Sequence, residues 1–180
     1  VLPAFQVDPE NAGEAVALNA ADVGAFTDAA RLQIASRARL PVAAAADARI
    51  VAFRSPDDTR EHVALIIGEQ SADRIPLVRL HSECLTGDIL GSLKCDCGPQ
   101  LAAALQAMGQ EADKGGWGIL LYMRQEGRGI GIINKLRAYR LQDQGFDTVD
   151  ANTRLGLPDE ARDFPTAARM LELLGVKAIR

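Results

Sequence analysis

Three cysteines are the residues of this chain whose type and spacing most clearly suggest chemistry. Cys84, Cys95 and Cys97 fall within 14 residues of a chain of 180 residues. Three thiolates are a soft ligand set suited to Zn²⁺, and three protein ligands leave the fourth tetrahedral position to water, as in catalytic zinc sites. The spacing differs from that of zinc fingers, where C-x2-C pairs dominate. It predicts an open zinc site, with three buried or merely reduced thiols as the alternative.

Polar residues crowd the same stretch of sequence. His81 is a rival fourth ligand, and its binding would close the zinc site. The other polar neighbours are Arg79, Ser82, Glu83, Thr86, Asp88 and Lys94. Such density directly after an apolar run is typical of a functional site, and a solvated loop is the alternative.

A glycine-rich stretch at 124–131 (RQEGRGIG) is a second candidate site. It does not match a dinucleotide fingerprint, because Ile132 and Asn134 stand where the third glycine would be required. Flexible glycines before a helix still favour an anion, since backbone N–H groups and the helix N-terminus carry positive partial charge. Five Lys or Arg residues accompany one Glu between positions 124 and 140. The stretch predicts a phosphate cradle, with a glycine-rich surface turn as the alternative.

Apolar runs and helical periodicities predict the elements that position these residues. Strands are expected at 62–68, 75–81 and 118–123, helices at 101–108, 132–144 and 167–174, and a strand beginning at 176–180. The run at 118–123 (GILLYM) is almost wholly apolar, which is typical of a strand buried on both faces. The alternation of strands and helices predicts an α/β fold with a largely buried sheet flanked by helices.

The first 47 residues differ from the rest. They are rich in Ala and contain no Cys, His, Lys or Trp, and Val23, Phe26, Ala30 and Ile34 recur at helical spacing. We therefore expect residues 1–47 to be a helical N-terminal segment and linker, which a preceding domain could have left as a remnant. Residues 48–180 would form the functional domain, incomplete at its C-terminus.

The composition argues against several classes of function. A formal net charge of −4, a pI near 5.2 and an aromatic content of 4% argue against a nucleic-acid partner. No apolar run approaches the roughly 20 residues that span a bilayer. An odd number of cysteines and no secretory signal predict a cytoplasmic protein with free thiols.

Three segments resemble GTP cyclohydrolase II, the zinc enzyme that opens riboflavin biosynthesis. They are residues 81–101 (HSECLTGDILGSLKCDCGPQL), 122–148 (YMRQEGRGIGIINKLRAYRLQDQGFDT) and 155–164 (LGLPDEARDF). The resemblance extends over roughly 48–180 and implies a mixed, largely buried sheet flanked by helices. It also implies that GTP is hydrolysed to formate, pyrophosphate and 2,5-diamino-6-ribosylamino-4(3H)-pyrimidinone 5′-phosphate.

The resemblance assigns roles to individual residues. Cys84, Cys95 and Cys97 match the ligands of one Zn²⁺ per chain, which activates the water that attacks C8 of guanine. The positions that match catalytic residues are Tyr139, Glu160 and Arg162. The positions that match GTP-binding residues are Arg79, Leu80, His81, Ser82, Glu83, Gln100, Glu126, Gly127, Arg128 and Thr148. Mg²⁺ is expected on the triphosphate, and a homodimer is expected for the assembly.

The chain departs from the family pattern in two places. Glu160 stands where the family usually has Asp, and the adjacent Asp159 is an alternative base. The sequence also ends before the family's Thr-Asn-Asn-Pro-x-Lys segment, which contributes a Thr and a Lys to substrate binding. Two other functions therefore stay open: a divergent paralogue that acts on another nucleotide or a uracil-related substrate, and a catalytically silent nucleotide-binding domain.

Overall fold

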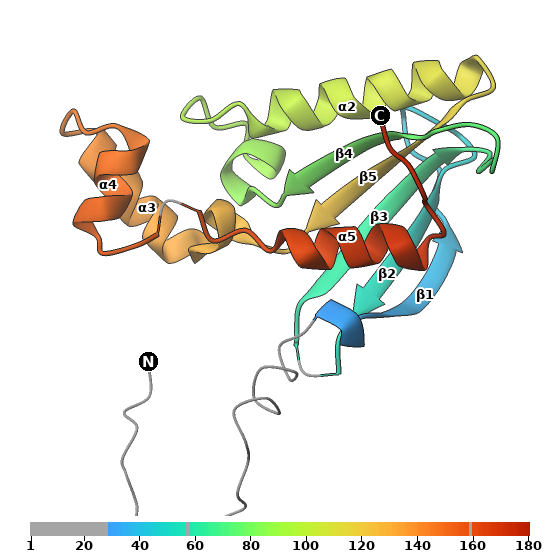
Figure 1. The fold of residues 1–180 in the computed structure, drawn as a ribbon. Coiled ribbons are helices and arrows are strands. Elements are labelled where there is room, and N and C mark those ends of the chain that lie inside the picture. The colour runs from blue at the N-terminus through green and yellow to red at the C-terminus, as the bar shows by residue number, and fades with distance from the viewer. Residues whose placement is uncertain (1–28, 57, 159) are drawn as a thin grey trace, which may run out of the picture.

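A computed structural model describes residues 29–56, 58–158 and 160–180. The described strands are β1 (Gln33–Arg39), β2 (Arg49–Arg54), β3 (Glu61–Gly68), β4 (Leu77–Ser82) and β5 (Trp117–Met123). They form a mixed sheet in the order β1-β2-β3-β5-β4, in which β4 and β5 are parallel and the other neighbours antiparallel (Figure 1). Because β4 and β5 run in one direction, the segments that follow them emerge at the same edge of the sheet.

Four longer helices of the described residues lie around the sheet. They are α2 (Cys97–Asp113), α3 (Gly131–Gln142), α4 (Thr148–Arg154) and α5 (Phe164–Leu173). Helices α2 and α5 lie on opposite faces of the sheet, and α3 and α4 lie beyond the ends of β4 and β5 (Figure 1). The predicted α/β fold with a mixed sheet and flanking helices is therefore confirmed.

Strand β5 supplies side chains to both layers of the core. Ile119 and Leu121 are buried in the cluster that contains Met170 of α5, whereas Leu120 is buried in the cluster that contains Met108 of α2. Alternate residues of a strand point to opposite faces, so a continuous apolar run is what a strand covered on both sides requires. The expectation for residues 118–123 is confirmed.

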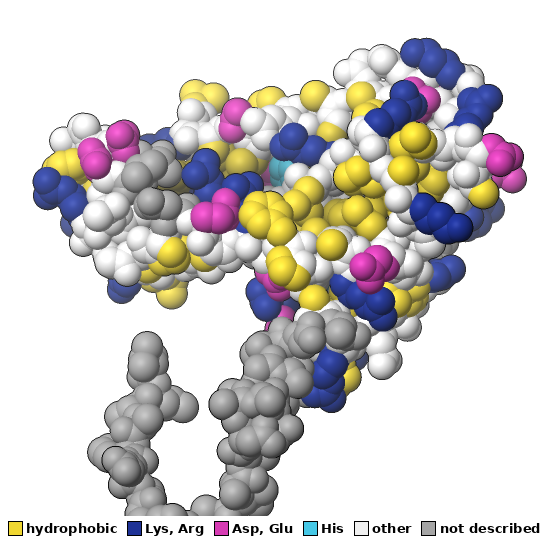
Figure 2. Space-filling view, viewed as in Figure 1, with side chains coloured by type: hydrophobic (Ala, Val, Ile, Leu, Met, Phe, Trp, Pro, Cys, Tyr) yellow, Lys and Arg dark blue, Asp and Glu magenta, His cyan; other side chains and the backbone are white. Residues whose placement is uncertain are grey.

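The surface carries both apolar and basic regions. Figure 2 shows apolar side chains gathered over α5, and Lys and Arg side chains gathered at the end of the molecule farthest from α4. No helix within the described residues combines the length and the apolar character that a membrane span requires.

Three predicted strands and three predicted helices correspond to β3, β4, β5, α2, α3 and α5. Three elements were not predicted, namely β1, β2 and α4. The segment 176–180 is not a strand, but the Arg180 N–H donates to Pro76 O (3.1 Å) and the Val78 N–H donates to Arg180 O (2.9 Å). These two bonds align Arg180 parallel to β4.

The helix expected over 23–34 is wrong where the structure describes it. Ala29–Arg31 forms a single 3-10 turn, and Ile34 lies in β1 opposite Phe53 of β2. The Ile34 side chain packs against the buried cluster of the α5 face, while most of the strand is exposed. Ile34 therefore fits the helical spacing only by coincidence, because its side chain points inward from an edge strand. The remainder of that prediction falls on residues 1–28, outside the described residues.

Candidate metal centre and substrate pocket

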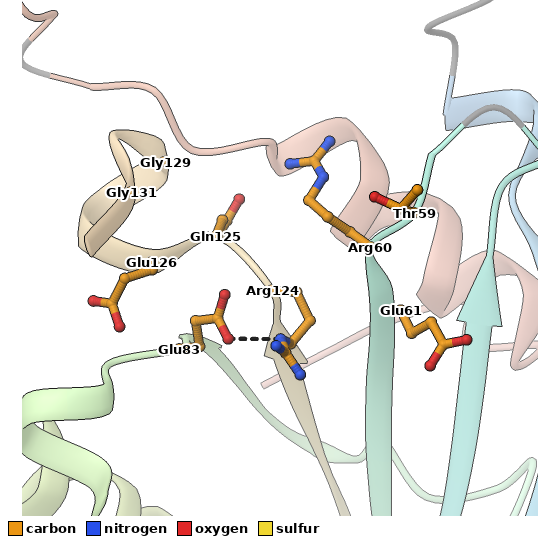
Figure 3. A pocket seen from close by; sticks show the side chains of 9 residues that line it. All are labelled: Thr59, Arg60, Glu61, Glu83, Arg124, Gln125, Glu126, Gly129 and Gly131. Atoms are coloured by element: carbon orange, nitrogen blue, oxygen red, sulfur yellow. Dashed lines mark ion pairs between the residues drawn. The ribbon is translucent and has the colours of Figure 1, made fainter. Parts of the chain in front are cut away.

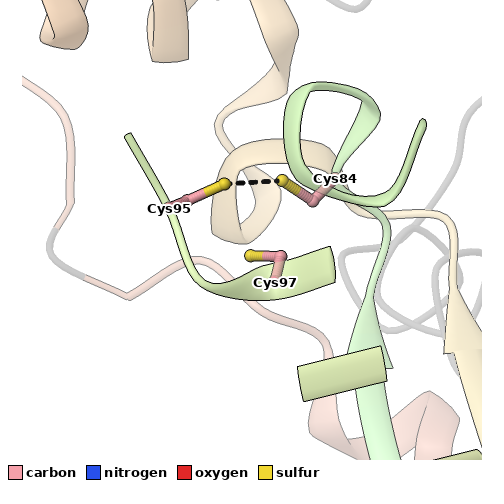
Figure 4. Close-up of side chains that lie close together, drawn as sticks. All are labelled: Cys84, Cys95 and Cys97. Carbon is pink, nitrogen blue, oxygen red and sulfur yellow. Dashed lines mark hydrogen bonds between the residues drawn. The ribbon is translucent and has the colours of Figure 1, made fainter. Parts of the chain in front are cut away.

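The three cysteine sulfurs converge beyond the end of β4 (Figure 4). Cys84 follows β4 and caps a single π-helical turn, η3 (Leu85–Ile89), whereas Cys97 is the first residue of α2. All three Sγ atoms lie within 4.8 Å of one another, and those of Cys84 and Cys95 are 3.6 Å apart. Tetrahedral zinc with Zn–S bonds of about 2.3 Å would separate two sulfurs by about 3.8 Å. The three free thiols are therefore close enough together to hold one zinc ion.

Two glycines allow the turns around the cysteines to approach this closely. A Cβ on Gly87 would lie 2.7 Å from the Cys95 Sγ, and a Cβ on Gly98 would lie 2.3 Å from the Gly87 carbonyl oxygen. Both distances are shorter than van der Waals contact, so Gly98 packs against the backbone of Gly87, and Gly87 packs against the Cys95 sulfur. This packing brings Cys95 and Cys97 to the sulfur of Cys84.

A buried carboxylate anchors Cys84 from behind. The Oδ2 atom of Asp88 accepts the Cys84 backbone N–H (3.0 Å) and the Tyr122 hydroxyl (2.8 Å). The Nε2 atom of His81 lies 3.0 Å from Oδ1 of Asp88, and both side chains are almost fully buried. His81 is thus bound to Asp88 and is not a member of the cysteine cluster, so the alternative in which it closes the site is not supported.

Lys135 dominates the electrostatics of the cluster. Its Nζ atom donates to the Cys84 Sγ (2.9 Å) and to Oε1 of Glu126 (2.8 Å). Burial by itself raises the pKa of the Cys84 thiol, but the hydrogen bonds from Lys135, Thr86 and Gly87 outweigh it and lower that pKa to about 7. Burial and the neighbouring thiols raise the pKa of Cys97 to about 12. Cys84 is therefore ionised more readily than Cys97.

The cluster opens into a pocket of about 280 Å³, which we call the cysteine pocket. It is lined by Ser82, Glu83, Cys84, Lys94, Cys95, Asp96, Cys97, Gly127, Arg128, Ile130, Lys135, Ala138, Tyr139, Gln142 and Asn152. The Tyr139 and Thr86 hydroxyl oxygens are 3.3 Å apart. Lys94 and Lys135 lie over the Tyr139 ring, with Nζ atoms 5.3 and 5.9 Å from its centroid. The tyrosine predicted to be catalytic thus shares the pocket with the cysteines.

The predicted GTP-binding residues of β4 point in different directions. Arg79 donates to Oε1 of Gln100 (2.8 Å), so these two predicted residues are in contact. Leu80 packs against the apolar core of the α5 face, and His81 is buried against Asp88. Only Ser82 and Glu83 line the cysteine pocket, because the strand ends there.

The glycine-rich stretch at 124–131, which we call the glycine–arginine loop, separates the cysteine pocket from a second cavity. In the turn η4 (Glu126–Gly129), Gly127 and Arg128 adopt left-handed φ angles of 63° and 60°. Gly127 and Arg128 line the cysteine pocket, and Glu126 lines the second cavity. That cavity, of about 490 Å³, holds an ion pair between Arg124 and Glu83 with an Nε–Oε2 distance of 2.6 Å (Figure 3).

Glu160 and Arg162 lie outside the lining of both cavities. The Arg162 Nε donates to Oε1 and Oε2 of Glu160 at 2.8 and 2.9 Å. Hydrogen bonds from Arg162 lower the pKa of Glu160 to about 2. Thr148 is the first residue of α4, and the alternative base Asp159 is outside the described residues.

The chain is similar to known proteins over most of its length. The model of the family described as GTP cyclohydrolase II matches residues 33–180. The chain belongs to the GTP cyclohydrolase II family. It is 53% identical over 152 residues to GTP cyclohydrolase-2 of Haemophilus influenzae (strain PittGG), a match covering 84% of this chain and 68% of the relative. It is 51% identical over 150 residues to GTP cyclohydrolase-2 of Histophilus somni (strain 2336), covering 83% and 67%.

A longer relative matches over a smaller share of its length. The chain is 55% identical over 130 residues to the riboflavin biosynthesis protein RibBA of Bacillus cereus (strain B4264). That match covers 72% of this chain and spans about a third, 32%, of the relative.

Three residues of this GTP cyclohydrolase II family member were not predicted as site residues. Asp88 holds the backbone of Cys84, Lys135 contacts its sulfur, and Gln125 is buried between the two cavities and α5. The polar density around the cysteines pointed to Asp88, and the basic run after the glycines pointed to Lys135. No sequence signal marked Gln125.

Proposed function

We propose that this chain catalyses the zinc-dependent hydrolysis of GTP to formate, pyrophosphate and 2,5-diamino-6-ribosylamino-4(3H)-pyrimidinone 5′-phosphate. The observation that carries the proposal is the convergence of three cysteine sulfurs in a pocket that also contains Tyr139 and the glycine–arginine loop. Family membership over residues 33–180 supports the same reaction. When bound to Cys84, Cys95 and Cys97, zinc supplies Lewis acidity that brings the pKa of water to about 7.

The side chains around the cysteines have separate tasks in this reaction. Tyr139 is held by Thr86 and stands beside the sulfurs, where its hydroxyl can orient water or the guanine ring. Arg128 enters the same pocket from the glycine–arginine loop and is suited to a phosphate oxygen. Arg79 and Gln100 form a hydrogen-bonded pair that we assign to substrate binding.

We assign Arg162 to charge stabilisation rather than to nucleophilic attack. Its hydrogen bonds to Glu160 raise the pKa of the guanidinium, so the proton is held more tightly than in a free arginine. A protonated guanidinium is a poor nucleophile but binds the oxygens of a departing phosphate well. Glu160, with a pKa of about 2, is ionised at neutral pH and orients Arg162. An Arg162→Lys variant that released pyrophosphate at a near-normal rate would contradict this role.

The remaining assignments also belong to the proposal. We expect one Zn²⁺ per chain, Mg²⁺ on the triphosphate, a homodimer and a cytoplasmic location. The free thiols of the cluster favour a reducing compartment. Exposed apolar side chains next to the cysteines, at Ile89, Leu90 and Leu93, favour contact with a second copy. Sedimentation or light scattering tests the assembly directly.

The decisive experiment incubates the full chain with GTP, zinc and magnesium and measures formate and pyrophosphate separately. Equal amounts of both products are expected. A panel of other nucleotides and uracil-related compounds tests the paralogue alternative, which predicts turnover of one of those compounds instead of GTP. Calorimetric binding of GTP with no formate under any metal condition would contradict the proposal and support a silent binding domain.

A further inference from the structure

Gln125 is a buried polar residue that the proposed reaction has not yet used. It lies two residues after the end of β5, is 3% exposed, and directly precedes the turn η4. Both ends of its amide are bonded: Nε2 donates to the Ser82 Oγ (2.9 Å), and Oε1 accepts the backbone N–H of Asp163 (2.8 Å). Loss of either partner would leave a buried polar atom of the amide without a hydrogen bond, so this geometry is strongly preferred.

The two partners of Gln125 belong to different parts of the site. Ser82 is the last residue of β4 and lines the cysteine pocket. Asp163 follows Arg162 directly and caps α5, where its carboxylate accepts the Thr166 backbone N–H (3.0 Å) and hydroxyl (2.6 Å). One amide thus joins the wall of the cysteine pocket to the start of the helix that follows Arg162.

A second contact holds the same segment against the same loop. A Cβ on Gly129 would lie 2.2 Å from the carbonyl oxygen of Ala161, so the two backbones are in direct contact there. Ala161 stands between Glu160, whose side chain is exposed, and Arg162, whose side chain is partly exposed; the two pair with each other, and the Arg162 guanidinium also lies over the Phe164 ring. The position of the 160–162 segment is therefore set by its two neighbours in the loop, Gly129 and Gln125.

We propose that Gln125 is a positioning residue that holds Arg162 at a fixed position relative to the cysteine pocket. The inference rests on the proposed function, in which formate is released beside the cysteines and pyrophosphate beside Arg162. Both reactions take place on one nucleotide, so the two regions must keep a fixed separation. Gln125 fixes it through Ser82 on one side and Asp163 on the other.

The test compares three substitutions of Gln125 in the full chain. Gln125→Met keeps the length and the volume but removes both hydrogen bonds. Gln125→Asn keeps the amide but is one methylene too short to reach both partners. Gln125→Glu keeps an acceptor for the Asp163 N–H and a second for the Ser82 hydroxyl, so it serves as the conservative variant.

The readout is the ratio of pyrophosphate to formate, which a purely structural role would not change. With GTP, zinc and magnesium, Gln125→Met and Gln125→Asn are each expected to lower this ratio about tenfold or more. A displacement of about 1 Å can cost 100-fold in rate. Gln125→Glu is expected to restore most of the wild-type ratio. If Gln125→Met does not fold, Gln125→Asn still provides the test.

Met170→Ala is the matched control. Met170 is fully buried in α5 and contacts the apolar core, so its truncation destabilises the same helix without touching the polar link. It is expected to lower both products in parallel. Parallel losses of both products in Gln125→Met and Gln125→Asn would overturn the inference and leave Gln125 a structural residue. Absence of formate from the wild-type chain would instead overturn the proposed function, and this inference with it.

Discussion

The Nζ atom of Lys135 lies 2.8 Å from Oε1 of Glu126, and both side chains are only 12% exposed. This ion pair connects the two cavities: Lys135 lines the cysteine pocket and contacts the sulfur of Cys84, while Glu126 lines the second cavity and accepts the Leu85 backbone N–H (2.7 Å). It joins α3 to both the glycine–arginine loop and the turn after Cys84.

Substituting one member of this ion pair should lower the free energy of unfolding more than substituting both members. Lys135→Met leaves a largely buried carboxylate without a cation and is expected to lower the free energy of unfolding by about 3 kcal/mol. Lys135→Met combined with Glu126→Gln should recover most of that loss. Denaturant unfolding of the single and double variants measures the coupling. The exposed pair of Arg54 and Glu61 is the control, with a much smaller coupling expected because solvent screens it.

Cys95→Ser should remove both the metal and the activity. The substitution replaces one soft ligand of a three-thiol set, so bound zinc is expected to fall well below one per chain, and formate release to fall by about 100-fold or more. Elemental analysis and a formate assay measure the two effects. Leu93→Ala, in the same loop and fully exposed, is the control and should retain its metal. Full zinc occupancy in Cys95→Ser would remove Cys95 from the ligand set.

Gly129→Ala should be markedly more destabilising than Gly145→Ala. Both glycines have similar positive φ angles, 93° and 95°, so each substitution carries a conformational cost of about 1–2 kcal/mol. Only at Gly129 would the new Cβ collide with the Ala161 carbonyl, whereas the space around Gly145 is open. We expect an additional loss of about 1–3 kcal/mol for Gly129→Ala. Equal losses in urea unfolding would mean that the 160–162 segment is not packed against the loop.

His62 should make the protein less stable in mild acid. It is buried in β3, and its Nδ1 accepts the Arg124 backbone N–H (3.0 Å). Burial, together with the nearby Arg60 charge, lowers the pKa of His62 below its usual value near 6.5. The unfolded chain therefore binds a proton more readily than the folded one. The contribution of His62 is complete above about pH 6.5 and is lost as the pH falls towards the lower pKa of the folded state.

The slope expected from this single group is at most about 1.4 kcal/mol per pH unit. His62→Asn keeps an acceptor near the position of Nδ1 but does not titrate in this range, so its stability should depend less on pH between about 6.5 and 5. Unfolding curves of both proteins across that range provide the comparison. The same slope in both would show that His62 is not the responsible group.

Elements that are buried on two faces were predicted from the sequence more accurately than elements at the edge of the sheet. The run at 118–123 could be recognised because a central strand is apolar throughout. Strand β1 (QIASRAR) could not, because an edge strand has little to bury and carries charges instead. The cysteine cluster was predictable because its members are close in sequence. Contacts such as Lys135 with Cys84, 51 residues apart, depend on how α3 packs and leave no local pattern.

The position of all three cysteines between β4 and the first turn of α2 has a consequence for the lifetime of the bound metal. The connection that carries the ligands is short, so closing it around an ion costs little chain entropy. A zinc ion held by these thiols is then expected to enter and leave by a local opening of residues 84–97, while the described strands stay paired. The rate of exchange with a chelator should consequently follow the mobility of this one connection and not the global stability of the fold.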